Sequence, residues 1–232
     1  MIRIVVAVVL SLAAAGCAVV PPAQTPVPAP LPPGAVDEAV RDALIQGASL
    51  AVGQLGRVNG FWSNAAVRVP VPEALARPAE AMRKLGMGAK VDAFHRALNT
   101  AAEQSVPYAA ELFIGAIREL TLDDARAVLD GGGDAATRLL RERSAAALTA
   151  RLLPYVQATT TRIGVTQRYK DLLADYGVLL RDSGLRHLDL DAYITQKTID
   201  GVFFLMAAEE ARIRRDARAR GTERMRQVFG SI

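Results

Sequence analysis

Apolar side chains recur at helical spacing along most of this 232-residue chain, beginning near residue 35. An early stripe, spaced i, i+4, consists of Val36, Val40, Leu44, Ala48 and Val52. A late stripe consists of Ile199, Val202, Phe203, Met206 and Ile213. Hydrophobic residues make up 51% of the chain but aromatics only 5%, and an Ala- and Leu-rich mixture of this kind favours helices over sheets. The pattern predicts an all-α fold, a single bundle-like domain of about seven to nine helices over residues 35–232.

Proline and glycine mark the expected helix boundaries. Gly86 and Gly88 are predicted to stop the helix that contains "PEALARPAEAMRK". Pro107 and Pro154 predict a break or kink in two longer helices. Near the C-terminus, Thr222 is expected to cap a short final helix.

The segment "GGGDAATRLL" has two interpretations. A glycine-rich loop can hold phosphate, but here no predicted strand precedes it and the Lys-Ser/Thr pair of a P-loop is missing. The simpler interpretation is a helix that ends at Gly131, followed by Asp134 as the N-cap of a helix over 135–163.

The first 17 residues predict where the protein is sent. "MIRIVVAVVLSLAAAGC" resembles a bacterial lipoprotein signal, with Arg3 before a short apolar run and small residues before Cys17, the only cysteine. We expect residues 1–16 to be removed as a signal peptide and Cys17 to carry a lipid anchor to the membrane. An ordinary secretory signal, which has the same build, is the open alternative. Because Ala18 follows the cysteine, the resemblance implies an outer-membrane lipoprotein that faces the periplasm.

A proline-rich spacer follows the cysteine within residues 17–34. "VVPPAQTPVPAPLPP" holds seven of the chain's twelve prolines, and such a tract forms an extended conformation without a core of its own. We therefore expect a disordered tether that reaches about 45 Å at about 3.1 Å per residue. Proline tracts also serve as ligands of proline-reading domains, which is the other open interpretation.

The formal net charge of +4 raises nucleic acid as a partner. Most arginines, however, alternate with Asp or Glu on the predicted helices, which is typical of a solvated surface with ion pairs, so we expect no nucleic acid partner. The C-terminal run "ARIRRDARARGTERMRQVFGSI" leaves two interpretations open. It is either a basic amphipathic helix that lies against anionic lipid or a solvated helix end.

Four blocks of the predicted helical domain resemble one known family. They are "QLGRVNGFWSNAAVRVPVPEAL", "AMRKLGMG", "LTLDDARAVLDGGGDAATRLLR" and "YITQKTIDGVFFLMAAEEARIRRD", in this order. Together they resemble the bacterial family catalogued as domain of unknown function 4197, over nearly all of the chain from residue 35. Members of that family look like exported proteins, some of them lipoproteins, which agrees with the interpretation of Cys17. The resemblance implies no activity, cofactor or catalytic residue.

The sequence offers few groups for catalysis. His95 and His187 lie on separate segments outside any HExxH or His-x-His pattern, and the single thiol is assigned to the lipid. These facts argue against a Cys/His zinc site, and "GASLAVG" lacks the second glycine of a serine nucleophile elbow. We expect no catalytic residue, no metal and no cofactor. His95 is interpreted as part of a helix surface, with a His95-based catalytic site as the alternative.

A polar cluster is expected on the late helix. Its members are Gln196, Lys197, Asp200, Glu209, Glu210 and Arg214. Glu209 and Glu210 could serve as paired carboxylates for acid–base work or for a divalent cation. The other interpretation is that they bridge to Arg212 and Arg214 on neighbouring turns.

The loop "NGFWSNAAVRVPVP" is the preferred candidate for partner binding. Its candidate residues are Phe61, Trp62, Asn64 and Arg68. The two aromatics either cap the core or form an edge for a partner. Asn64 and Arg68 are expected to hydrogen-bond an acidic or peptidic partner.

These features favour a membrane-anchored, periplasm-facing binding or scaffold module of the cell envelope, with an envelope protein as its partner. The alternative is a carrier of a small apolar ligand or lipid, held in the bundle between Phe203, Phe204 and Met206. A third class is a hydrolase or metal-dependent enzyme that uses Glu209 and Glu210.

Overall fold

The computed structural model describes residues 32, 34–121, 125–176 and 188–230. Over these residues the chain is all-α, as predicted, with eight α-helices, two short 3₁₀ helices and no strand. The α-helices are α1 (Ala35–Leu55), α2 (Ala76–Lys84), α3 (Gly88–Glu119), α4 (Ala125–Asp130), α5 (Ala135–Ile163), α6 (Val165–Tyr176), α7 (Leu190–Arg215) and α8 (Glu223–Phe229). The 3₁₀ helices are η1 (Glu73–Leu75) and η3 (Ala217–Ala219).

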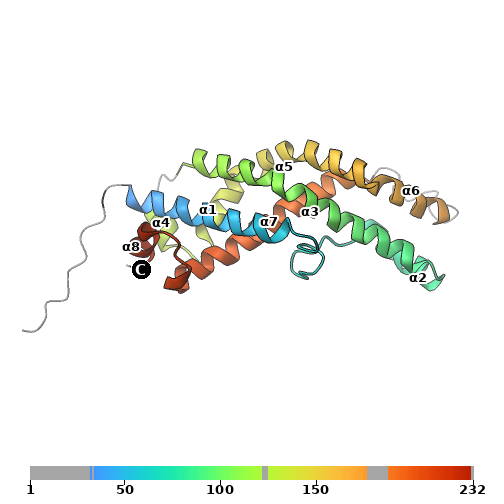
Figure 1. Cartoon of the computed structure of the whole chain (residues 1–232), viewed down its shortest axis with the longest axis horizontal. Coiled ribbons are helices and arrows are strands. Elements are labelled where there is room, and N and C mark those ends of the chain that lie inside the picture. The colour runs from blue at the N-terminus through green and yellow to red at the C-terminus, as the bar shows by residue number, and fades with distance from the viewer. Residues whose placement is uncertain (1–31, 33, 122–124, 177–187, 231–232) are drawn as a thin grey trace, which may run out of the picture. The chain divides into compact units, whose positions relative to one another are not determined.

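The main core lies between the four long helices (Figure 1). α1 packs mainly on α7, α5 lies against both α3 and α7, and α3 also contacts α1. Aromatic rings from different helices meet in this core. Phe113 of α3 lies edge-on to Phe203 of α7, with ring centroids 4.9 Å apart, and Phe94 of α3 stacks on Tyr169 of α6 at 5.8 Å. The predicted bundle-like arrangement is confirmed.

A smaller core closes the end of the bundle where α4 and α8 lie against α1 (Figure 1). Four large apolar side chains of the C-terminal run, up to residue 230, are buried there, each at most 1% exposed: Ile213, Met225, Val228 and Phe229. As far as residue 230, the run therefore lacks the exposed apolar face with which a helix binds a lipid surface. Thr222 accepts a hydrogen bond from Met225 N at 3.1 Å, which confirms it as the cap of α8.

The structure shows no helix break at the two prolines, whereas a kink at either of them stays a prediction. α3 continues through Pro107 and α5 continues through Pro154. A proline inside a helix costs about 3 kcal/mol, but both side chains are exposed and the helices around them bury long apolar faces, which outweigh that cost. The role of Gly88 is also corrected, because it is the first residue of α3, whereas Gly86, with a φ of 80°, follows the end of α2.

Several predictions fall outside the described residues. The signal peptide over 1–16, Cys17, nearly all of the spacer over 17–34, and His187 belong to this group. Among the helices of the described part, none has the length and hydropathy of a membrane-crossing segment.

Candidate functional site

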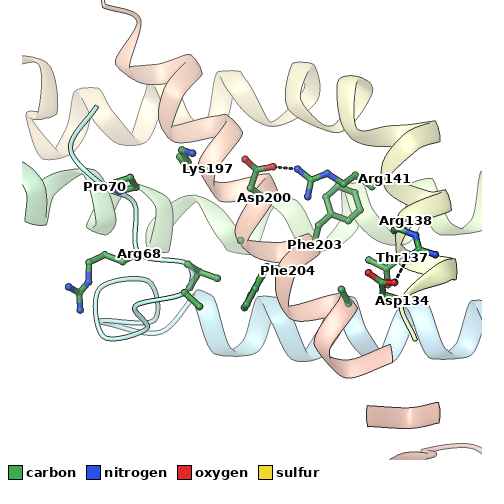
Figure 2. Close-up of a pocket in the computed structure, with 14 residues that line it drawn as sticks. Arg68, Pro70, Asp134, Thr137, Arg138, Arg141, Lys197, Asp200, Phe203 and Phe204 are labelled. Atoms are coloured by element: carbon green, nitrogen blue, oxygen red, sulfur yellow. Dashed lines mark hydrogen bonds and ion pairs between the residues drawn. The ribbon is translucent and has the colours of Figure 1, made fainter. Parts of the chain in front are cut away.

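Three segments that are distant in the sequence meet at one open groove (Figure 2). They are the loop of residues 57–72, which we call the Arg68 loop, the start of α5 and the middle of α7. The groove, which we call the α5–α7 groove, has a volume of about 510 Å³. Its charged lining residues are Arg68, Asp134, Arg138, Arg141, Lys197 and Asp200.

A polar stripe on α3 holds the Arg68 loop in place. His95, Asn99 and Glu103 are spaced i, i+4, i+8, so they lie on one face of the helix, and all three bind loop backbone. Asn99 both accepts from Val69 N and donates to Val69 O, each at 2.9 Å. His95 Nε2 lies 2.9 Å from the same carbonyl, and because a carbonyl only accepts, Nε2 must carry the proton. This stripe was not predicted as a unit, although its i+4 spacing can be read from the sequence.

Glu103 organises the first half of the loop from a buried position. Its Oε1 accepts from Phe61 N at 3.2 Å and from Trp62 N at 3.1 Å, and its Oε2 accepts from Asn59 N at 3.1 Å. Arg96 donates to Asn59 Oδ1 at 2.6 Å, which supports the left-handed φ of 65° at Asn59. Three backbone donors on one carboxylate satisfy the buried charge and fix the turn.

Phe61 belongs to the core. It is fully buried and its ring packs against Gly201 of α7. Of the two interpretations of this residue, the structure shows the core cap, so the ring offers no edge to a partner.

The other loop candidates lie nearer the surface. Trp62 is half-buried beneath two guanidinium groups, with Arg96 Cζ 4.1 Å and Arg68 Cζ 5.1 Å from its ring centroid. Asn64 shapes the turn, because its Oδ1 accepts from Ala66 N at 3.1 Å. Of the four predicted loop residues, Arg68 is the one that lines the groove.

The predicted polar cluster on α7 is divided between two places. Lys197 and Asp200 line the groove, where Gln196 donates to Asp200 at 3.1 Å. Glu209, Glu210 and Arg214 lie further along α7 and are buried or nearly so. The groove thus brings Arg68 together with Lys197 and Asp200. Arg68 was predicted as part of the partner-binding loop, and the other two were predicted as part of the polar cluster.

The charges in the groove are only partly balanced. Asp134 pairs with Arg138 at 2.6 Å and Asp200 pairs with Arg141, as Figure 2 shows. Lys197 instead lies 5.7 Å from the centroid of the Tyr193 ring, and Arg68 donates through Nε to Trp62 O at 2.6 Å. Neither Lys197 nor Arg68 has a carboxylate partner among the described residues.

Glu210 and not Asp134 caps α5. Asp134 occupies the expected N-cap position but its side chain makes no capping hydrogen bond. Glu210 of α7 instead accepts from Ala136 N at 3.0 Å and from both the N (2.8 Å) and Oγ1 (2.7 Å) of Thr137. A carboxylate at this helix end is favoured both by the free N–H groups and by the helix dipole.

Arg214 completes the same arrangement at the end of α4. It donates to Glu210 at 2.8 Å and to the carbonyls of Leu129 and Val128 at 2.6 and 3.0 Å. The Glu210–Arg214 pair therefore joins the C-terminus of α4 to the N-terminus of α5, and the glycine-rich segment between them serves as a connection between two capped helices.

Glu209 is likewise engaged in packing contacts. Arg212 donates to it through two nitrogens, both at 2.7 Å, and Gln46 of α1 donates at 2.7 Å. Burial raises the pKa of Glu209, but the hydrogen bonds from Arg212 and Gln46 outweigh it and hold the pKa below its usual value. Both adjacent carboxylates thus bridge to arginines on neighbouring turns, and no group of three His, Cys, Asp or Glu side chains that could hold a metal ion occurs within the described residues.

His95 is half-buried beside Trp62, with ring centroids 4.9 Å apart. Burial lowers its pKa below the usual value; the hydrogen bond to Val69 O acts the other way, and the charge of Arg68 adds to the lowering. An imidazole that holds loop backbone in this way serves as a structural element.

Comparison with known proteins identifies one family. The family described as "Protein of unknown function (DUF4197)" matches residues 31–230, which is nearly the whole span that the sequence blocks indicated. No curated protein and no solved structure matches the chain.

Proposed function

The chain belongs to the DUF4197 family of proteins of unknown function, and we propose that it is a binding module of the cell envelope whose partner site is the α5–α7 groove. The observation that carries this proposal is that Arg68 of the loop lines one groove together with Lys197 and Phe204 of α7. Two of these are cations for which the described part of the chain offers no carboxylate partner, and Phe204 is a large apolar side chain that is 49% exposed. Such a combination suits an interface better than it suits a solvated surface.

The Arg68 loop supports this function because it is organised before any partner binds. Glu103 and Asn99 hold its backbone at both halves, and Tyr193 Oη donates to Pro70 O at 3.0 Å, which ties the loop to α7. A surface fixed in this way loses little conformational entropy on association.

The carrier hypothesis receives less support. Phe203 and Met206 are packed in the core, at most 2% exposed, whereas Phe204 faces the groove. An apolar pocket between α2, α3 and α6 measures about 20 Å³, room for about one water molecule. An enzyme that relies on Glu209 and Glu210 is also disfavoured, because both carboxylates are held by arginines.

The sequence supports a location for this module. The lipoprotein-type signal and Cys17 favour a lipid anchor, and residues 18–34 are long enough to hold the domain away from the membrane. We place the module at the outer membrane, facing the periplasm, where a groove of this kind would meet envelope proteins.

A photo-crosslinking amino acid at position 204 of the full chain, expressed in its own envelope, tests the proposal. We expect a crosslinked protein band that disappears when Arg68→Glu and Lys197→Glu are added. The same crosslinker at Leu85, which is 68% exposed and away from the groove, serves as the matched control. Equal capture from both positions, or capture that ignores the two charge reversals, would contradict a partner site in the groove.

A further inference from the structure

We infer that the α5–α7 groove recognises a short acidic peptide segment with an apolar side chain among its carboxylates, presented by a partner protein. This inference rests on the proposed function and adds the chemistry of the partner. It draws on the charge balance of the groove, its apolar floor and the state of the loop backbone.

The charge balance favours an anionic ligand. Four cationic and two anionic side chains line the groove, and each carboxylate is already matched by one arginine, Arg138 or Arg141. The two remaining cations, Arg68 and Lys197, come from different segments. A ligand with more than one carboxylate therefore finds a cation from the loop and another from α7.

Aromatic faces hold these cations in position. Arg68 lies over the Trp62 ring and Lys197 lies beside the Tyr193 ring. Such contacts stabilise a cation without neutralising it, so both charges remain available to a carboxylate.

The apolar part of the groove favours a ligand that carries an apolar side chain as well as negative charge. Phe204 lies near the middle of the lining residues (Figure 2), with Val67 and Pro70 from the loop and Ala207 on the next turn of α7. A free inorganic anion would leave this surface uncovered, whereas an apolar side chain of a peptide would bury the exposed half of Phe204.

The loop backbone excludes recognition by strand addition. The N–H groups of Ala66, Val67 and Arg68 are bound to Asn64, and that of Val69 is bound to Asn99. Because these donors are occupied, a peptide must be read by side chains, that is, by the cations and by Phe204.

Fluorescence anisotropy with the full chain in detergent tests the inference. The probe is a labelled short peptide of aspartates and glutamates around one central phenylalanine. The comparison peptides carry glycine in place of the phenylalanine, or lysines in place of the acidic residues. Citrate and vesicles of phosphatidylglycerol are added as competitors, since they represent a small anion and an anionic lipid surface.

The variants are Arg68→Glu, Lys197→Glu and Phe204→Ala, with Lys170→Glu as the matched control. Lys170 is an exposed lysine of α6 outside the groove, and all four positions are at least partly exposed, so the fold should persist, as thermal unfolding would verify. We expect each groove charge reversal to weaken binding by at least about tenfold, Phe204→Ala to weaken it several-fold, and Lys170→Glu to change it by less than about twofold.

Three results would overturn the inference: no saturable binding, an equal effect of Lys170→Glu, or equal binding of the peptide that lacks phenylalanine. Displacement by citrate or by the vesicles with the same dependence on Arg68 and Lys197 would assign the groove to that anion instead. If crosslinking at position 204 captures a protein while the acidic peptide does not bind, the proposed function stands and the acidic-peptide inference fails.

Discussion

The ring of Phe61 occupies the space beside Gly201 that a β-carbon would need. A Cβ built on Gly201 would lie 2.7 Å from Phe61 Cε1 and 3.0 Å from Cζ, closer than packed atoms tolerate. Gly201 also lines the α5–α7 groove. The contact that inserts the Arg68 loop into the core therefore also sets the position of the loop relative to the groove.

Replacing Gly201 by Ala should displace Phe61 and loosen the Arg68 loop. Overpacking costs about 1–3 kcal/mol, whereas the better helix propensity of alanine stabilises the helix by about 1 kcal/mol. We therefore expect the free energy of unfolding, measured in urea, to fall by about 1 kcal/mol. Gly115→Ala is the matched control, because a Cβ on this other helical glycine meets nothing within 4 Å. That variant should be more stable than the wild type by up to about 1 kcal/mol. A Gly201→Ala protein as stable as Gly115→Ala would contradict the Phe61–Gly201 contact.

Removing the carboxylate of Glu210 should be far more damaging than removing that of Asp134. Glu210→Ala leaves Arg214, whose side chain is 8% exposed, without its carboxylate partner and leaves the first N–H groups of α5 without their acceptor. Loss of one member of a buried pair costs about 3–5 kcal/mol, whereas Asp134 makes an exposed pair with Arg138 worth less than about 1 kcal/mol. Urea unfolding followed by circular dichroism gives both values. The capping role of Glu210 is wrong if Asp134→Ala costs as much.

Mild acid should destabilise the protein through His95. Because burial lowers the pKa of His95 in the folded state, the unfolded chain takes up this proton first as the pH falls. The stability is fully present above the ordinary histidine pKa of about 6.5 and is lost as the pH drops from there through the folded pKa. His95→Gln should therefore flatten the dependence of the urea midpoint on pH between about pH 7 and about pH 5. Parallel profiles for wild type and His95→Gln would refute this assignment.

If Cys17 carries a lipid anchor, replacing it should change the cell fraction in which the protein is found. Cys17→Ser should move the protein from the detergent-extracted membrane fraction to a soluble or uncleaved form, because two or three acyl chains supply the membrane affinity. Intact mass of the wild type should show a chain that begins at residue 17 and carries a diacylglyceryl group. A mature protein cleaved elsewhere, with a free thiol or none, would favour the ordinary secretory signal.

Much of the fold was predictable because it follows from local patterns. The helix over 135–163 was placed correctly, because Gly131 and Asp134 mark its start in the sequence. Pro154 was misjudged because local propensity is outweighed by the packing of a long helix. The Glu210 cap of α5 could not be predicted from the α5 sequence, because its acceptor comes from another helix.

Individual residues of the candidate site could be predicted from the sequence, but their meeting in one groove could not. Arg68, Lys197 and Asp200 were all selected from the sequence, yet as members of two separate candidates. Their meeting depends on the insertion of Phe61 against Gly201, a contact between segments that no local pattern reports. The polar stripe of α3 could be recognised in the sequence as an i+4 repeat. That it binds the backbone of the Arg68 loop could not be predicted, because this depends on the path of the loop in the folded protein.

Two-dimensional NMR of the ¹⁵N-labelled full chain, titrated with the acidic peptide, tests the central claim most directly. We predict saturable shifts that cluster at residues 66–68 of the loop, at 138–141 of α5 and at 197–204 of α7. These shifts should shrink when the ionic strength rises from about 0.1 M to about 1 M, where the Debye length falls from about 10 Å to about 3 Å. Shifts that spread over basic residues outside the groove, such as Lys170, or that never saturate, would show that the groove is not a specific partner site.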